Sequence, residues 1–250
     1  MKSMSREEVG VSTATSHGGM LRSVVKAFLP RSVRERLAVR RRERAFHSAM
    51  QRLLADPMRV LSDTDPLLRS LAFGWGNEGW SANEGYLRSC VREALDSDGP
   101  VLECGSGLST IVLAAVLRGS GRSIWSLEHH DEWRGRIRAT LVRYGLQNAH
   151  VCEAPIVDYG EFSWYRPPFE KMPYGFGLVV CDGPPSVTPG GRYGLVPVMA
   201  KRLSGRFTLL LDDAIREAEQ ETAQRWATEL SASVETLGER PYFRIRPTQS

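Results

Sequence analysis

The residues best suited to chemistry are a short glycine turn and the acids that end three later apolar stretches. The stretch 101–110 reads VLECGSGLST, in which an apolar run ends in Gly105-Ser106-Gly107 before a helical pattern begins. Glycines at these positions would let the backbone approach a ligand where a Cβ would clash. The start of the following helix would then face an anionic group. The turn therefore predicts a ligand-binding loop, although a tight turn without a ligand also fits it.

Glu128, at the end of the next apolar stretch, indicates which class of ligand this loop would bind. An acid at this point can bind both hydroxyls of a ribose. A dinucleotide fingerprint needs a third glycine, but Thr110 stands there, and Glu103 stands where an apolar residue is usual. A carboxylate at Glu103 suits a ligand with an ammonium group, and S-adenosylmethionine has one and lacks a pyrophosphate. The loop therefore favours S-adenosylmethionine over a nicotinamide dinucleotide.

The elements that must position these residues alternate between short apolar strands and helical stretches. Alternation of this kind predicts an α/β fold with a parallel sheet that is covered by helices on both faces. A tight turn near Gly238 and Arg240 predicts that the last two strands form an antiparallel hairpin at one edge. We expect strands at 100–104, 123–128, 149–153, 177–182, 206–212, 232–238 and 241–246, and helices from 108, at 131–144, 193–203 and 214–230.

The chain resembles the class I S-adenosylmethionine-dependent methyltransferases in three features. These are the motif Glu-x-Gly-x-Gly at 103–107, an acid about 20 residues later, and Asp182 after the fourth strand. The resemblance covers the chain from about residue 70 to its end. It implies a doubly wound, seven-stranded, mostly parallel sheet of Rossmann-like type in which the last strand is reversed. It also implies that the cofactor is bound by Glu103, Gly105, Ser106, Gly107, Glu128, His129, Ala154, Pro155 and Asp182.

A tryptophan-containing segment precedes the helix that leads into the first strand. The resemblance implies that this segment covers the methionine end of the cofactor, so that Trp75, Asn77 and Ser81 join the site. Ser81 and Glu84 have the spacing of a capping box and predict that a helix begins here. For Trp75 and Trp80, ordinary packing is the alternative.

Three acids, Asp182, Asp212 and Asp213, end the fourth and fifth predicted strands, at the edge where such sheets bind ligands. Carboxylates gathered there repel one another unless a cation is present, and oxygen ligands suit Mg²⁺. The arrangement resembles the metal-dependent O-methyltransferases of the catechol type. This resemblance implies that all three acids bind Mg²⁺, which would activate the acceptor hydroxyl. In the alternative, Asp182 serves the acceptor directly and Asp213 caps the helix from 214.

Features next to Asp182 narrow the class of acceptor. The catechol-type enzymes have a lysine base shortly after the corresponding aspartate, whereas Asp182 is followed by Gly183-Pro184-Pro185. The inserted Gly183 also departs from the Asp-Pro-Pro motif of amino-group methyltransferases. Sugar O-methyltransferases with paired aspartates resemble the chain better. Arg192, in a glycine-containing loop beside Asp182, is a candidate for binding an acidic group of the substrate.

The segment 154–176, between the third and fourth strands, has no clear periodicity and is rich in aromatic residues. Long segments of this kind in compact domains are usually functional or disordered, and the aromatic content argues against disorder. We expect a lid or a wall of the substrate site, with ordinary packing onto the sheet as the alternative. The aromatic residues are Tyr159, Phe162, Trp164, Tyr165, Phe169, Tyr174 and Phe176.

Positive charge is concentrated in residues 1–60, which hold 13 Lys and Arg against 5 Asp and Glu, whereas the remainder holds 20 against 24. A nucleic-acid groove through the main domain is therefore not expected. We predict a basic N-terminal extension over 1–60, disordered in 1–20 and helical over 32–55, followed by a cofactor-binding methyltransferase domain over 61–250. The basic face of the helix is either solvated or a peripheral contact with an anionic membrane surface.

Composition and cysteine content set the remaining limits. Four cysteines far apart in 250 residues, without a CxxC pair, disfavour a disulfide framework and a zinc site and indicate a reduced, cytoplasmic compartment. We expect methyl transfer from S-adenosylmethionine to a hydroxyl of a small molecule or glycan, with Asp182 as the catalytic residue. The alternatives are a protein of the same fold that binds the cofactor without catalysis and, disfavoured by Thr110 and Glu103, a nicotinamide-dependent dehydrogenase.

Overall fold

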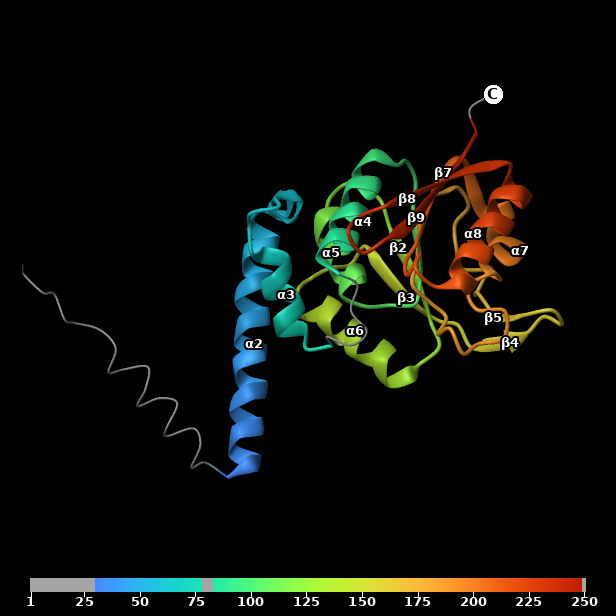
Figure 1. The fold of residues 1–250 in the computed structure, drawn as a ribbon. Coiled ribbons are helices and arrows are strands. Elements are labelled where there is room, and N and C mark those ends of the chain that lie inside the picture. The colour runs from blue at the N-terminus through green and yellow to red at the C-terminus, as the bar shows by residue number, and fades with distance from the viewer. Residues whose placement is uncertain (1–29, 78–82, 249–250) are drawn as a thin grey trace, which may run out of the picture. The chain divides into compact units, whose positions relative to one another are not determined.

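The fold is built on a seven-stranded sheet, seen in a computed structural model that describes residues 30–77 and 83–248 (Figure 1). The strands are β1 (Val101–Cys104), β2 (Ile124–Glu128), β3 (Ala149–Glu153), β6 (Phe176–Cys181), β7 (Leu203–Leu211), β8 (Ala232–Leu237) and β9 (Tyr242–Pro247). They lie in the order β3-β2-β1-β6-β7-β9-β8, and the first five of these are parallel. β9 is antiparallel to β7 and β8, which confirms the predicted hairpin at one edge.

Helices pack on both faces of this sheet, which confirms the doubly wound α/β architecture. The described helices are α2 (Arg31–Ala55), α3 (Leu67–Trp75), α4 (Glu84–Asp96), α5 (Leu108–Val116), α6 (Asp131–Arg143), α7 (Leu195–Met199) and α8 (Glu217–Leu230), with short 3-10 helices η1 (Pro57–Leu61) and η2 (Ala200–Arg202). Side chains of α3, α4, α5 and α6 belong to the core on one face, and those of α7 and α8 belong to the core on the other.

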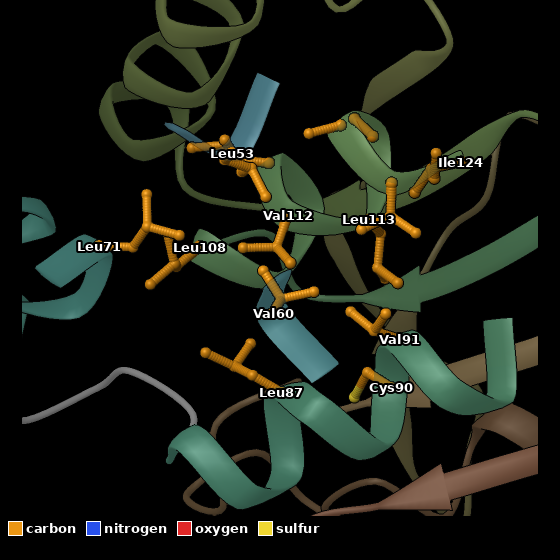
Figure 2. Packing of buried hydrophobic residues seen from close by; sticks show 14 of the residues in the cluster. Leu53, Val60, Leu71, Leu87, Cys90, Val91, Leu108, Val112, Leu113 and Ile124 are labelled. Carbon is orange, nitrogen blue, oxygen red and sulfur yellow. The ribbon is translucent and has the colours of Figure 1, made fainter. Parts of the chain in front are cut away.

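The two cores follow from the alternation of side chains along each strand. Successive residues of a strand point to opposite faces, so Val101 of β1 belongs to one core with Val91 and Ile124, while Leu102 belongs to the other with Trp226. Figure 2 shows the first of these cores, where apolar side chains of α4 and α5 interlock. All four residues of β1 are buried, as expected for a central parallel strand.

The segment 154–176 folds into a small antiparallel hairpin of β4 (Ile156–Asp158) and β5 (Ser163–Tyr165). In a parallel sheet a helix usually makes this crossover. Trp164 and Tyr165 are fully buried in the second core, so packing onto the sheet, the alternative to a lid, accounts for much of the segment's aromatic content. The exposed aromatic residues are Tyr159, Phe169 and Tyr174.

The chain divides into two compact units, residues 1–42 and 43–250. The second unit begins before residue 61, where the sequence placed the start of the main domain. The reason is that Met50 and Leu53 of α2 are fully buried in the core on the side of α4 and α5. The C-terminal half of α2 is therefore part of the folded domain rather than of the extension.

In the first unit, the part of α2 over residues 31–41 has exposed side chains. Val33 and Leu37, two apolar side chains of this part, are 37% and 47% exposed. Contact of the basic helix with a membrane surface stays a prediction. Residues 1–20, expected to be disordered, lie outside the described residues.

Helix α4, which precedes strand β1 in the chain, is capped by a different residue from the predicted one. α4 begins at Glu84, and the side chain of Asn83 accepts a hydrogen bond from the N–H of Tyr86 at 3.0 Å. Asn83 is thus the N-cap, and the prediction that Ser81 caps this helix through Glu84 is wrong. Ser81 itself lies outside the described residues.

Two further properties concern the cysteines and the helices. All four cysteines are buried and free of disulfide bonds. Within residues 30–77 and 83–248, no helix combines the length and the apolar character that crossing a membrane requires.

We predict that Leu53→Ala lowers the free energy of unfolding by about 2–5 kcal/mol, because it leaves a cavity in the core. Leu37 lies on the same helix but is exposed, so Leu37→Ala should change the free energy of unfolding by less than about 0.5 kcal/mol. Urea denaturation of the two variants measures this difference. Equal effects would contradict the place of Leu53 in the core.

Candidate active site

The loop after β1 is held against the end of the neighbouring strand β2. Gly105 has a φ of 88°, which L residues rarely adopt, and its N–H donates to the carbonyl of Leu127 at 2.9 Å. The backbone N–H and the hydroxyl of Ser106 both donate to Glu128, at 3.1 and 2.8 Å. Gly107 is the N-cap of α5. The predicted loop residues therefore lie together at the carboxyl ends of β1 and β2.

Glu103 is a buried carboxylate that accepts hydrogen bonds from three hydroxyl groups. Thr110 and Ser126 donate to it at 2.5 and 2.6 Å, and Ser109 donates as well. Burial raises the pKa of Glu103, and the three hydroxyl donors oppose that rise. Because only 2% of the residue is exposed, its contacts are with the protein. Glu103 ties β1 to β2 and to the start of α5, and so shapes the loop that lies between them.

Thr110 has a structural reason to replace the third glycine of a dinucleotide fingerprint. It is fully buried, donates to Glu103, and accepts a hydrogen bond from the N–H of Gly107 at 2.9 Å. A glycine here would leave Glu103 with one donor fewer and Gly107 without this acceptor. The departure from the fingerprint is therefore built into the network that holds the loop.

Glu128 ends β2 with only 4% of its surface exposed. Besides its two bonds from the glycine loop, it accepts one from the N–H of His130 at 2.8 Å and lies 3.4 Å from Nδ1 of His129. Ala154 is buried and donates its N–H to the carbonyl of Glu128 at 2.9 Å, and Pro155 follows it, half-buried. Glu128, His129, Ala154 and Pro155, which the resemblance assigns to the cofactor, thus form one group at the ends of β2 and β3.

Trp75 lies in the core. It is 4% exposed, its ring centre is 5.6 Å from that of Trp133, and the guanidinium of Arg136 lies 4.0 Å from the ring. Ordinary packing, the alternative for Trp75, accounts for this position, and Asn77 is half-buried just after it. Trp133 donates from Nε1 to the carbonyl of Ser106 at 2.6 Å, so the aromatic cluster supports the glycine loop. No motif in the sequence pointed to Trp133.

Asp182 and Asp212 follow the ends of neighbouring strands, as predicted. β6 and β7 pair in parallel with Cys181 opposite Leu211, and the N–H of Asp212 donates to the carbonyl of Cys181 at 3.2 Å. The N–H of Asp182 donates to the carbonyl of Cys104 at 3.3 Å, directly before the glycine loop. These acids therefore lie at the same edge of the sheet as the loop.

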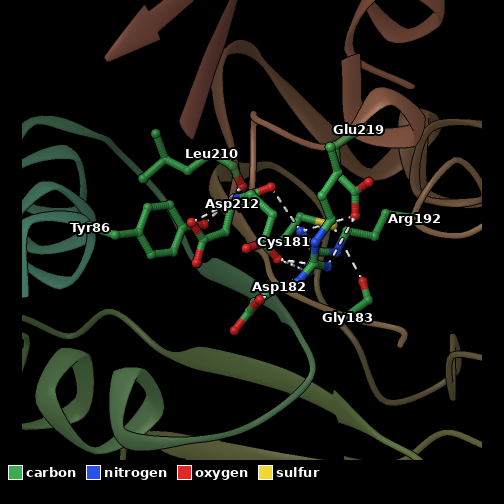
Figure 3. Close-up of polar contacts among 10 residues, drawn as sticks. Tyr86, Cys181, Asp182, Gly183, Arg192, Leu210, Asp212 and Glu219 are labelled. Carbon is green, nitrogen blue, oxygen red and sulfur yellow. Dashed lines mark hydrogen bonds and ion pairs between the residues drawn. The ribbon is translucent and has the colours of Figure 1, made fainter. Parts of the chain in front are cut away.

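The guanidinium of Arg192 lies among these acids (Figure 3). One terminal nitrogen donates to Asp182 and to Asp213, at 3.0 Å each. The other donates to the main-chain oxygen of Asp212 at 2.9 Å and lies 3.6 Å from a carboxylate oxygen of Glu219. The Arg192 side chain is only 3% exposed. The expectation that Arg192 binds an acidic substrate group is therefore wrong, because its partners are the protein's own acids.

The predicted Mg²⁺ site does not fit this arrangement. Asp182 and Asp213 already share one cationic partner, and Asp212 accepts the N–H of Asp213 at 2.8 Å. A metal ion on these oxygens would lie about 4 Å from the guanidinium, where two like unit charges repel by about 4 kcal/mol even at an effective dielectric constant of about 20. Among the described residues, no group of three or more His, Cys, Asp or Glu could hold a metal ion. The assignment of these three aspartates as metal ligands is thus corrected.

Asp213 does not cap the helix that follows it. α8 begins at Glu217 rather than at 214, and its N-cap position is Arg216, which makes no side-chain capping bond. Asp213 has a φ of 63°, a left-handed conformation that aspartate adopts more often than most residues. Its carboxylate pairs with Arg192 and also with Arg216, at 2.9 Å. The predicted capping role is therefore wrong, and Asp213 belongs to the charged cluster.

Asp182 is the acid of this cluster that is most open to an acceptor. Its side chain keeps 40% exposure, compared with 30% for Asp213. Its carboxylate nevertheless lies deep at the sheet edge, and this burial raises the pKa of Asp182 to about 7, while Arg192 opposes the rise and Asp212 adds to it. A carboxyl group with a pKa near neutrality can accept or release a proton at physiological pH.

Gly183 departs from the Asp-Pro-Pro motif for a steric reason. Its N–H donates to the carbonyl of Cys104 at 2.8 Å, and a Cβ at this position would clash with the hydroxyl of Tyr165. Tyr165 comes from β5, and its ring centre lies 6.0 Å from that of His129. Only the aromatic content of its segment pointed to Tyr165 in the sequence. The structure places it between the two groups of predicted site residues.

No protein-family model and no curated protein matches the sequence of this chain. Solved structures do match its fold. SAH-bound methyltransferase PaMTH1 of Podospora anserina aligns with a TM-score of 0.55 and 14% identity over 96% of this chain and 100% of that one. An O-methyltransferase of Bacillus cereus in complex with SAH aligns with a TM-score of 0.53 and 14% identity over 80% and 97%. A methyltransferase of Geobacter sulfurreducens aligns with a TM-score of 0.50 and 10% identity over 92% and 96%.

The chain has the Rossmann-like methyltransferase fold. This confirms, for the fold, the resemblance that was indicated by Glu103, the glycine loop, Glu128 and Asp182. The reversed last strand is part of that confirmation. At these identities the likeness concerns the fold, so the activity of this methyltransferase-fold protein has to be inferred from its site.

We predict that Thr110→Val lowers the free energy of unfolding by about 1–3 kcal/mol, because the isosteric apolar side chain leaves Glu103 and Gly107 each without one partner. Thr140→Val is the matched control. The hydroxyl of Thr140 bonds to the carbonyl of Arg136 one helical turn away, and its loss should cost less than about 0.5 kcal/mol. Chemical denaturation measures both values, and a fully stable Thr110→Val protein would contradict the network.

Proposed function

We propose that the protein transfers the methyl group of S-adenosylmethionine to a hydroxyl group of a small molecule or glycan. The observation that carries this proposal is the position of Asp182, partly open at the sheet edge beside the glycine loop, with a carboxyl group suited to accept a proton. The fold supports it, because PaMTH1 and the Bacillus cereus O-methyltransferase have the same fold and are bound to SAH.

The residues at the ends of β1 and β2 suit this cofactor. A Cβ on Gly107 would meet nothing closer than the hydroxyl of Ser109 at 3.8 Å, so the backbone here is open to a ligand. Glu128 accepts three hydrogen bonds from the protein, and a carboxylate has about four acceptor positions, which leaves one for a ribose hydroxyl. His129, with 34% of its side chain exposed, lies beside it.

When bound, S-adenosylmethionine supplies a methyl group on a positively charged sulfur, which an acceptor oxygen can displace. Asp182 would accept the proton that the acceptor hydroxyl loses as its oxygen bonds to the methyl carbon. The glycine loop would hold the cofactor, and the sheet edge would bring acceptor and methyl group together. Positioning of this kind can supply much of the rate enhancement.

A hydroxyl acceptor suits this site better than an amino group. An alcohol must lose its proton as the new bond forms, and Asp182 provides a proton acceptor there. Gly183 interrupts the motif of the amino-group methyltransferases, and the backbone packing against Tyr165 requires a glycine at that position. The Bacillus cereus protein of the same fold is itself described as an O-methyltransferase.

We predict that SAH binds the wild-type protein and that Glu128→Gln weakens binding by about 1.5–3 kcal/mol, the range for hydrogen bonds to a charged group. Glu153→Gln is the matched control, since Glu153 ends the neighbouring strand opposite Glu128 but pairs with Arg134 at the surface. Isothermal titration calorimetry measures the affinities, and melting curves check that each variant is folded. Unchanged affinity in folded Glu128→Gln would contradict the cofactor assignment.

We predict that turnover depends on the ionised form of Asp182. Below its pKa of about 7, Asp182 is protonated and cannot accept a proton, so kcat/KM should fall about tenfold for each pH unit below that value and level off above it. Asp182→Asn should lower the rate throughout and remove this dependence. The rate of SAH formation with a panel of hydroxylated small molecules and sugars provides the measurement.

A wild-type rate that does not change across this pH range would contradict the role of Asp182. SAH binding without SAH formation on any acceptor of the panel would favour the alternative, a protein of this fold that binds the cofactor without catalysis.

A further inference from the structure

Arg192 is buried in the loop between β6 and α7, and its donors reach three separate elements. It contacts Asp182 at the end of β6, the main-chain oxygen of Asp212 and the carboxylate of Asp213 after β7, and Glu219 near the start of α8. Each of these partners carries a full or partial negative charge. A single cation therefore joins segments that meet only in the folded chain.

A second arginine lies next to this cluster but contacts fewer of its members. Arg216 pairs with Asp213 at 2.9 Å and lies 3.7 Å from Glu219. Its side chain is 47% exposed, whereas that of Arg192 is 3% exposed. Arg216 is therefore a natural comparison for Arg192, since it shares two acidic partners but has no contact with Asp182 among its ion pairs.

We propose that Arg192 is the resident cation of this acid cluster. It takes the place between Asp182 and Asp213 that a divalent metal ion would need, and it positions the Asp182 carboxylate for the acceptor. The second part rests on the proposed function, whereas the first part does not. Because Arg192 is almost fully buried, it acts through Asp182 without touching the acceptor.

A guanidinium is well suited to this task. It is planar, presents several donors in fixed directions, and stays charged at every physiological pH. These properties let it hold two carboxylates and a main-chain oxygen in one arrangement, where a metal ion would demand its own coordination geometry. The site would consequently be complete in the absence of divalent cations and insensitive to a chelator.

The test is Mn²⁺ binding, measured by electron paramagnetic resonance and calorimetry without any acceptor. The wild-type protein and Arg216→Gln should show no Mn²⁺ site that depends on Asp182. Arg192→Gln removes the cation, so it should gain a site with a dissociation constant of about 10⁻⁴ to 10⁻³ M, typical of weak carboxylate sites. The double variant Arg192→Gln/Asp182→Asn should lose that site again.

Two results would overturn the proposal. One is a Mn²⁺ site in the wild-type protein that Asp182→Asn abolishes. The other is a folded Arg192→Gln protein that still binds no Mn²⁺, because the guanidinium would then not occupy a cation's position. If Arg192→Gln does not fold, Mn²⁺ binding by Arg192→Lys is compared with that of the wild type instead. Arg192→Lys keeps the positive charge, so it should fold and bind no Mn²⁺. A Mn²⁺ site in Arg192→Lys would contradict the proposal.

The positioning role has its own readout. On an acceptor that the wild type methylates, Arg192→Gln should lower kcat about 100-fold, the scale of a misplaced reacting group, with SAH affinity unchanged. Arg192→Lys should restore part of this loss, and a chelator should leave the wild-type rate unchanged. Equal rates in Arg192→Gln and wild type would refute positioning. Failure of the proposed function would look different, because the wild type itself would then either bind no SAH or bind SAH without forming it from any acceptor of the panel.

Discussion

The carboxylate of Glu103 lies at the end of the central strand β1 with almost no access to water, and the candidate site depends on how this charge is satisfied. A buried charge is costly unless it is paired or hydrogen-bonded. Its three hydroxyl partners stand on β2 and at the start of α5. Satisfying Glu103 therefore fixes the geometry of Gly105, Ser106 and Gly107 without any ligand.

Arg192 has the corresponding role on the other half of the sheet edge. There the buried charge is positive, and its partners come from the ends of β6 and β7 and from α8. The two clusters meet where the backbone of Gly183 packs against Cys104 and Tyr165. This arrangement leaves Asp182 between the glycine loop and a fixed cation, which is where the proposed function needs a proton acceptor.

Much of the fold can be predicted from the sequence, because the signals that define it are local. β3 was expected at 149–153 and is observed there, and the other sheet strands deviate by three residues at most. The hairpin of β4 and β5 was not predicted, since its residues are held by packing onto a distant surface of the sheet. The division within α2 was missed for the same reason, because burial of Met50 and Leu53 depends on helices that follow later in the chain.

The sequence by itself determined that the glycine loop, Glu128 and Asp182 would gather at one edge of a parallel sheet, since the carboxyl ends of such strands meet there. It could not decide what neutralises the acids at that edge. Asp213 and Arg192 are 21 residues apart along the chain, and the choice between a metal ion and a guanidinium depends on which side chain the folded loop brings between them. Only the tertiary structure places Arg192 there, because ion pairing across distant segments leaves no periodic signal in the sequence.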